Sequence, residues 1–219
     1  MPTEFQGFPG AMAFLEGLKA NNDRAWFSLH KEAYEQDLKT PADAFAATLS
    51  PELAELAGQP VSAKVFRVHR DVRFSRDKTP YNTHLHIGFT PVQPAAEPRR
   101  GGYYFGLEPG KLTVGVGVFG FEPSELERYR RAAINDGAEL VRILAALGTR
   151  VDEPELKRVP APFAADHPHA QALRRKSLTA WRDLDSLDQL GGPALAGTVL
   201  AAFTQLNPLN DWLTEALRP

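Results

Sequence analysis

The segment between Lys64 and His84 carries residue types that bind anions. It holds six Lys or Arg against two Asp, a local charge of +4 in a chain whose net charge is −2. Arginine presents a planar set of donors that matches carboxylate and phosphate oxygens, and imidazoles transfer protons near neutral pH. The segment therefore predicts a site for a phosphate- or carboxylate-bearing ligand, with His69 and His84 as the catalytic candidates for proton transfer.

Alternation along two predicted strands places many of these side chains on a common surface. Alternate residues of a strand point to opposite faces, so a strand over 61–74 separates its apolar side chains from a polar set, with Arg70 as the one cation on the apolar side. In a second strand over 83–90, His84 and His86 lie opposite Leu85 and Ile87. The residues that we expect to contact the ligand are Arg67, Asp71, Arg73, Ser75, Lys78, Tyr81 and His86.

Glycines in a later predicted strand indicate open space above this surface. Gly115 and Gly117 lie opposite a row of valines, and Gly88 and Gly106 extend the same floor. A glycine inside a strand often marks close approach by a ligand or by another backbone segment. The pattern predicts a pocket with a glycine floor. In the structural alternative, a closely packed helix covers the glycines, or the polar face is a solvated ladder of ion pairs.

Two other functions use the same residues. His84 and His86 have a spacing found in metal sites, which gives a metal-dependent hydrolase as an alternative, with His69 and Asp71 completing the ligands. The nearby arginines disfavour a cation, so no metal ligand is predicted. The second alternative is nucleic-acid binding through the basic stretch together with 174–176, which the acidic balance of the whole chain does not favour. A purely structural role stays open, and no cofactor is indicated.

The chain reads as one α+β domain over 1–219. Helical patterns cover 9–20, 24–38 and 41–57 before the strands, which are expected at 61–74, 83–90, 102–107 and 111–119. After residue 123 a long helix with an interruption at Gly137 is followed by helices at 169–181, 193–206 and 210–217. A tight turn at 108–110 joins the last two strands as a hairpin. We therefore expect a central antiparallel sheet of about four strands within 61–120, flanked by N-terminal and C-terminal helices.

Composition narrows the cellular setting. The chain has no cysteine, which excludes disulfides, thiolate metal sites and a cysteine nucleophile. No apolar run approaches the roughly 18 residues that cross a bilayer, and no signal peptide is recognisable, so we expect a cytoplasmic protein without a membrane partner. A small anionic ligand is the expected partner, and the oligomeric state is not indicated.

Three segments together resemble one known family. They are 21–27 (NNDRAWF), 65–81 (VFRVHRDVRFSRDKTPY) and 156–160 (LKRVP) with 166–168 (DHP). From about Phe8 to Trp181 the chain is similar to domain-of-unknown-function family 2461, a group of conserved hypothetical proteins. It departs from the family pattern at Asn82, where Lys is expected, and at Ala161 and Pro162, where Lys-Gly is expected. The resemblance implies no reaction, ligand or cofactor, but it identifies 67–81 as the family's signature.

Overall fold

A six-stranded antiparallel sheet forms the centre of the protein. The computed structural model describes residues 4–92 and 101–218. The strands follow the spatial order β1-β2-β3-β4-β6-β5, and each pairs antiparallel with its neighbour. The α+β class is confirmed, and the sheet has two strands more than the four expected. The strands are β1 (Val61–Val65), β2 (Leu85–Pro91), β3 (Gly102–Glu108), β4 (Lys111–Val118), β5 (Arg150–Val151) and β6 (Leu178–Asp183).

Helices precede and follow strands β1 to β4 in the chain, as the sequence predicts, whereas β5 and β6 lie among the C-terminal helices. The N-terminal set is α1 (Ala11–Ala20), α2 (Arg24–Leu29), α3 (Lys31–Ala33), the π-helical turn η1 (Tyr34–Lys39) and α4 (Thr40–Ala57). The C-terminal set is α5 (Pro123–Asn135), α6 (Gly137–Leu147), α7 (Ala170–Leu173), the 3-10 turn η2 (Leu187–Gln189) and α8 (Ala194–Ala216). No helix within the described residues is long and apolar enough to span a membrane.

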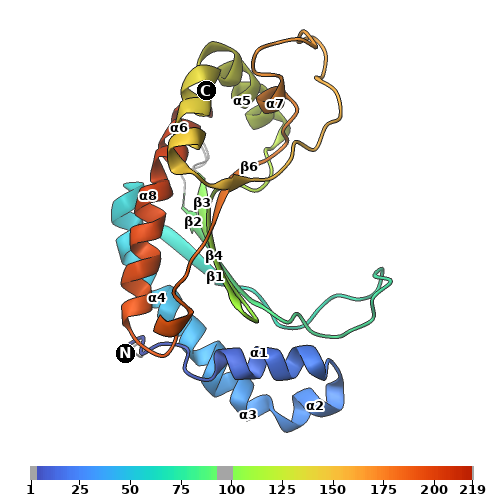
Figure 1. The fold of residues 1–219 in the computed structure, drawn as a ribbon, viewed down its shortest axis with the longest axis vertical. Helices are drawn as coiled ribbons and strands as arrows, with labels where there is room; N and C mark the ends of the chain where they lie inside the picture. Colours follow the sequence, from blue (N-terminus) through green and yellow to red (C-terminus); the bar gives the residue numbers. More distant parts are fainter. Residues whose placement is uncertain (1–3, 93–100, 219) are drawn as a thin grey trace.

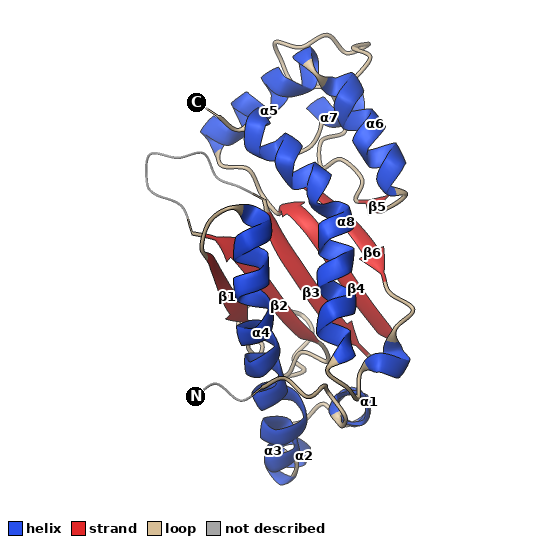
Figure 2. Ribbon diagram, turned by 90° about the vertical axis from the view of Figure 1, so that its left-hand side faces the viewer, coloured by secondary structure: helices blue, strands red, loops and turns tan. Residues whose placement is uncertain are grey.

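Helices α4 and α8 cover one face of the sheet, as Figure 2 shows. The aromatic rings of Phe105 in β3 and Phe45 in α4 lie 4.7 Å apart, and the ring of Phe203 in α8 lies 5.3 Å from that of Tyr103. These side chains are fully buried. The apolar side chains that alternate along β2, β3 and β4 therefore face these two helices, and burial of these side chains holds the sheet and the helices together.

Among residues 4–92 and 101–218, no helix layer covers the opposite face of the sheet. In Figure 1, α1 to α3 lie at one end of this open face and α5 to α7 at the other, so the protein has a concave side. The hairpin of β3 and β4 was predicted correctly and forms the middle of this face. Its turn pairs Glu108 with Lys111, and Gly110 adopts φ +77°, which glycine accepts without strain.

Two C-terminal elements differ from their predictions. The helix expected over 169–181 is only the short α7, and the chain then forms strand β6, which pairs with β4. Thr179 and Trp181 suit a strand, and pairing with β4 satisfies an otherwise open edge. The two helices expected at 193–206 and 210–217 are one continuous helix, α8, which contains Pro208. Burial of residues on both sides of Pro208, including Phe203 and Leu213, overrides its tendency to break a helix.

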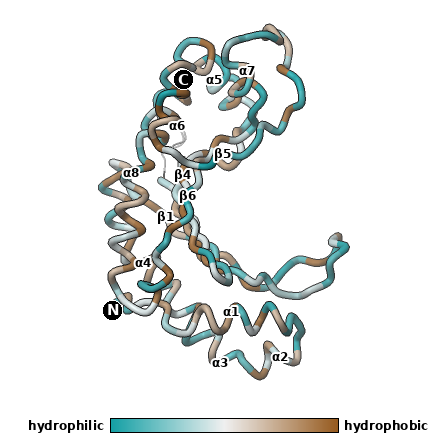
Figure 3. The backbone as a smooth tube through the Cα atoms, viewed as in Figure 1, coloured by the Kyte–Doolittle hydropathy of each residue, from teal (hydrophilic) through white to brown (hydrophobic). Residues whose placement is uncertain are grey.

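The first strand ends much earlier than predicted. It stops at Val65, and residues 66–84, hereafter the basic segment, project beyond the sheet. The regular pairing of Val65 with Ile87 gives way to a single bridge between His69 and Tyr81. Between these two pairs, one chain segment has three residues (66–68) and its partner has five (82–86). The register of pairing therefore shifts, and the regular ladder ends. Figure 3 shows that this projection is mostly hydrophilic. Strict alternation from 67 to 74 was therefore a wrong guide to side-chain direction.

Candidate functional site

The open face of the sheet carries the histidines and glycines that the sequence placed together. Register brings His86 opposite Gly106, Gly88 opposite Tyr104, and Gly115 opposite both Tyr104 and Trp181. These residues alternate with the buried row that faces α4 and α8. The shared face predicted for His86, Gly88 and the β4 glycines is therefore present.

Aromatic side chains, rather than a helix, lie against most of these glycines. A Cβ atom added at Gly115 would come within 2.6 Å of the Trp181 ring, and one at Gly88 would come within 3.4 Å of the Phe66 ring. At Gly106 the nearest side chain is that of Tyr104, at 3.1 Å. The glycines thus allow large rings to lie flat on the sheet, and they leave open space only between those rings.

His84 and His86 form a stacked pair at the edge of this face. Their ring centroids are 3.7 Å apart, and the His86 ring also contacts the edge of Tyr104. Burial lowers the pKa of His84, with the positive charge of Arg70 adding to the effect and Glu108 opposing it. Burial, reinforced by His84, lowers the pKa of His86 to about 4. Both imidazoles are therefore neutral at pH 7 and can accept a proton.

Within the basic segment, two arginines are engaged by aspartates of the same segment. Arg73 forms a two-point contact with Asp71, with Nε donating to Oδ1 at 2.9 Å and Nη2 to Oδ2 at 2.6 Å. Arg70 donates from Nη1 to Asp77 at 2.6 Å and to the carbonyl oxygen of Thr79 at 3.1 Å. The pair of Arg73 and Asp71 is exposed to solvent, whereas the Arg70 side chain is only 24% exposed.

The other residues of the basic segment that we predicted for the site make contacts within the protein that fix the conformation of the segment. Lys78 donates to the carbonyl oxygen of Val72 at 3.0 Å, close to Ser75, whose backbone N–H bonds to the same carbonyl. Tyr81 is buried, with its ring stacked 4.2 Å from that of Phe27, and His69 packs edge-on against both rings. Of the predicted ligand contacts, Ser75 and Lys78 thus lie near the tip and Tyr81 at the base.

Asn22 fixes the base of the basic segment to the N-terminal helices. Its side-chain amide donates to the carbonyl oxygen of Tyr81 at 2.9 Å and accepts from the backbone N–H of Tyr81 at 3.1 Å. Asp23 begins α2 by accepting from the backbone N–H of Trp26, as the sequence suggests for an Asx run. The chain between α1 and α2 therefore fixes the base of the basic segment where it leaves the sheet.

A groove with a volume of about 330 Å³ is lined by both halves of the basic segment and by Asn22, which precedes α2. Arg70 and His84 both line it. His84 is one of the two predicted catalytic histidines, and Arg70 is the arginine that the alternation had assigned to the apolar face. Arg67, His69 and Arg73 are not among its lining residues. The full set is Asn22, Arg70, Asp77, Thr79, Tyr81, Asn82, Thr83 and His84.

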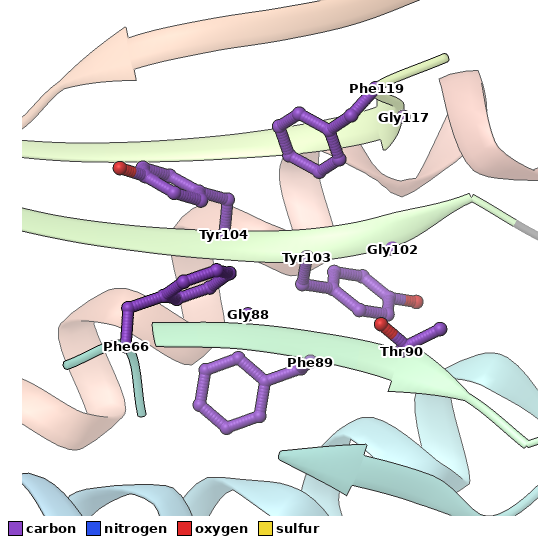
Figure 4. A pocket seen from close by; sticks show the side chains of 9 residues that line it. All are labelled: Phe66, Gly88, Phe89, Thr90, Gly102, Tyr103, Tyr104, Gly117 and Phe119. Atoms are coloured by element: carbon purple, nitrogen blue, oxygen red, sulfur yellow. The ribbon is translucent and has the colours of Figure 1, made fainter. Parts of the chain in front are cut away.

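A second cavity, of about 170 Å³, opens on the same face over β2, β3 and β4. Figure 4 shows the rings of Phe66, Tyr104 and Phe119 around it. Phe66 was expected in the core, but it lies on the open side and is 46% exposed. In β1 the apolar residues Val61, Ala63 and Val65 alternate with Ser62 and Lys64. The same alternation puts Phe66 on the side of Ser62 and Lys64, which is the open side.

A third, polar cavity of about 220 Å³ involves residues that sequence reasoning missed. Trp181 donates from its ring N–H to Asp152 at 2.9 Å, and Arg150 pairs with the same aspartate at 3.2 Å. Their strands β5 and β6 come from a region read as irregular or helical. The alternation of Thr179, Trp181 and Asp183 is the one signal that could have found them.

No metal site is evident in the part of the chain that the structure describes, because it contains no group of three or more His, Asp or Glu placed to hold an ion. The rings of His84 and His86 are within 17° of parallel.

Residues 174–176, which the nucleic-acid alternative combined with the basic segment, follow α7 at the other end of the open face (Figure 1).

Comparison with known proteins places the chain in a family without assigning an activity. A search among curated proteins finds no match. The family described as "Conserved hypothetical protein (DUF2461)" matches residues 10–212, which is nearly the whole chain and includes the N-terminal helices, the sheet and most of α8. The protein therefore belongs to family DUF2461.

Proposed function

We propose that this protein binds a small ligand bearing a phosphate or carboxylate group in the groove between Arg70 and His84. The observation that supports this most directly is that these two side chains line one open groove together with side-chain amides and hydroxyls. A concave site with a few converging polar groups is the usual form of a small-molecule site. The wider basic segment adds a positive field that attracts anions.

Arg70 is the principal anion contact in this proposal. A guanidinium has five N–H donors, and the hydrogen bonds of Arg70 to described residues all use Nη1. Nε and Nη2 are therefore left for a second acceptor. Because the Arg70 side chain is 24% exposed and that of Arg73 is 76% exposed, a charge-assisted bond made at Arg70 is less screened than one at Arg73.

Asp77 shows how a carboxylate is held at this position. Hydrogen bonds from the backbone N–H of Thr79 and from Arg70 lower the pKa of Asp77 to about 2, so it is ionised at neutral pH. Its negative charge opposes a second anion. A ligand carboxylate or phosphate must therefore bind beside Asp77 through the remaining Arg70 donors, or take its place.

His84 supplies the proton chemistry in this proposal. Its neutral imidazole accepts a proton as an anion approaches, because a nearby negative charge favours the cationic form. His69 contacts Phe27 and Tyr81 at the base of the segment, so we assign it a positioning role. Arg67, Arg73 and Lys78 contribute to the field rather than to direct contact.

The test is calorimetric titration with phosphate, pyrophosphate and citrate, supported by thermal unfolding. A ligand that binds the folded state raises the midpoint by mass action. Arg70→Ala should abolish binding, while Arg76→Ala, an exposed arginine of the same segment outside the groove, should reduce it only slightly. Loss of binding in Arg67→Ala with Arg73→Ala, but not in Arg70→Ala, would place the site outside the groove, on another part of the basic segment. Absence of binding by every anion overturns the proposal.

The same titration with an oligonucleotide tests the nucleic-acid alternative. An oligonucleotide that neutralises several phosphates with Lys and Arg binds with a steep dependence on salt, because each contact releases counterions. A small anion held mainly by Arg70 should show a shallow dependence. A steep dependence with oligonucleotide, without binding of the small anions, would favour the basic segment as a nucleic-acid surface and reject the groove.

A further inference from the structure

The cavity over the glycines of β2, β3 and β4 has the form of a slot for a flat ring. Its walls are the rings of Phe66, Tyr104 and Phe119 (Figure 4), and its floor consists of backbone at Gly88 and Gly117. We call this cavity the aromatic slot. The Tyr104 and Phe119 centroids are 5.8 Å apart, with the rings tilted by 54°. Because Gly88 has no Cβ atom, the Phe66 ring lies close to the backbone there, 3.4 Å from where a Cβ atom would be, and a planar ligand beside that ring can approach the sheet.

The volume of the slot indicates what part of a ligand it holds. At about 170 Å³, it is smaller than the roughly 300–1,000 Å³ of pockets that enclose a whole drug-sized ligand. It therefore accommodates one ring system, and the rest of the ligand must lie outside it. Phe66 and Phe119 are 46% and 48% exposed, so each has ring surface to give to a ligand. Stacking against such surfaces is tolerant of ring identity.

The surface that leads away from the slot is polar and reaches the anion groove. Going back along the chain from Gly88, the next residues on the open side are His86 in β2 and His84 just before it, whose rings are stacked. Four residues of extended chain cover at most about 13 Å. Lys64 lies directly across from Gly88 in the register of β1 and β2, with its amine 5.0 Å from the Phe66 ring centroid. Positive charge is therefore present both beside the slot and at Arg70.

We infer that the open face binds a nucleotide, with the base in the aromatic slot and the phosphates extending past His86 to Arg70. This inference rests on the proposed anion site and names its ligand class. A nucleoside di- or triphosphate joins a planar ring to a chain of anionic groups over the distance between slot and groove. A short aromatic acid places its charge next to its ring and would leave the Arg70 groove empty.

The test compares ring-bearing and ring-free anions by calorimetry. The probes are the triphosphates of adenosine, guanosine, cytidine and uridine, the four corresponding nucleosides, and inorganic triphosphate. At least one nucleoside triphosphate should bind more tightly than inorganic triphosphate by about 5- to 150-fold, the range for one stacked base. Phe66→Ala with Phe119→Ala should remove this preference and leave the affinity for inorganic triphosphate unchanged.

Matched variants keep the result interpretable. Phe74→Ala removes a ring that is 96% exposed and lies outside the slot, so it should retain the preference. Gly88→Leu fills the slot from its floor and should also remove the preference, which covers the case in which the double alanine variant does not fold. Thermal unfolding checks the fold of each variant.

The outcomes separate this inference from the proposed function. If inorganic triphosphate binds and no nucleoside triphosphate binds more tightly, the nucleotide is rejected while the anion site stands. If nucleosides bind but inorganic triphosphate does not, the slot takes a ring without phosphates and the nucleotide is rejected; the anion site is rejected with it when phosphate, pyrophosphate and citrate also fail to bind. If nothing binds, both proposals fail. A preference that survives both slot variants places the ring elsewhere and overturns the inference.

Discussion

The imidazole rings of His84 and His86 stack face to face, with centroids 3.7 Å apart and planes 17° apart. Both rings are partly buried, which disfavours the charged form, and His84 further disfavours a charge on His86. The pKa values of both residues are accordingly lowered, that of His86 to about 4. The pair is therefore neutral at pH 7, and an approaching anion is what would make protonation of His84 favourable.

The first prediction concerns the pH dependence of anion binding. The lowered pKa of His84 reflects burial and Arg70, opposed by Glu108. A bound anion raises this pKa, so binding takes up a proton and the affinity rises as the pH falls toward the pKa of free His84. We expect a limiting gain of about tenfold per pH unit for one coupled proton. Calorimetric titration with sulfate measures it, because the charge of sulfate stays constant near neutral pH.

Substitutions assign the linked proton. His84→Gln should remove the pH dependence, whereas His69→Gln should retain it, because His69 does not line the groove. His86→Gln should also retain it, because His86 is neutral at the pH where the affinity changes. A dependence that survives in His84→Gln and disappears in His69→Gln would assign the proton to the base of the segment instead.

The second prediction concerns the attachment of the basic segment. The amide of Asn22 makes two partly buried hydrogen bonds with the backbone of Tyr81. Each is worth about 0.5–1.5 kcal/mol, so Asn22→Ala should lower the free energy of unfolding by about 1–3 kcal/mol in urea titrations. Asn21→Ala is the control, because Asn21 makes one exposed bond to Gly17. Equal losses in the two variants would show that Asn22 does not hold the segment.

The third prediction concerns the contact between β4 and β6. Gly117 has φ +138°, and a Cβ atom there would approach the Leu178 carbonyl oxygen to 2.1 Å. Gly117→Ala adds backbone strain and a clash with main-chain atoms, so it should cost at least about 2 kcal/mol of unfolding free energy. Gly120→Ala meets nothing within 4 Å and should change the stability by less than about 0.5 kcal/mol. A tolerated Gly117→Ala would mean that the two strands are not so closely paired.

The fold could be predicted where local pattern and long-range pairing agree. The turn at 108–110 sets the register of β3 and β4, and alternating apolar residues then choose the buried face, so both strands were found to within one residue at each end. β6 was not found, because its run of mixed polar and apolar residues also suits a helix and its strand identity depends on pairing with β4, about 65 residues earlier. Pairing over such distances leaves no local signal.

The site was predicted in part for the same reason. His84 and His86 fall on the open face because β2 is regular, whereas Arg67 and Arg73 do not, because the ladder ends after residue 66 through a register shift. The segment 67–74 alternates like a strand, but its partner residues include Pro80, which has no N–H to donate to a ladder. Trp181 and Phe66 join the face only through strand pairing, which the residue types alone do not specify.

The fourth prediction concerns the acid titration of Asp77. Its pKa is lowered to about 2, first by the backbone N–H of Thr79 and then by Arg70. A carboxylate whose folded pKa is depressed contributes stability above its unfolded pKa near 3.8, and this contribution is lost as the pH falls through about 2. Carbon-13 NMR of the Asp77 carboxyl group should therefore show a midpoint near 2. In Arg70→Ala the midpoint should rise but stay below 3.8, because the Thr79 N–H remains. A full return to 3.8 would show that Arg70 alone holds the carboxylate, and an unchanged midpoint would show that Arg70 does not contact the carboxylate in solution.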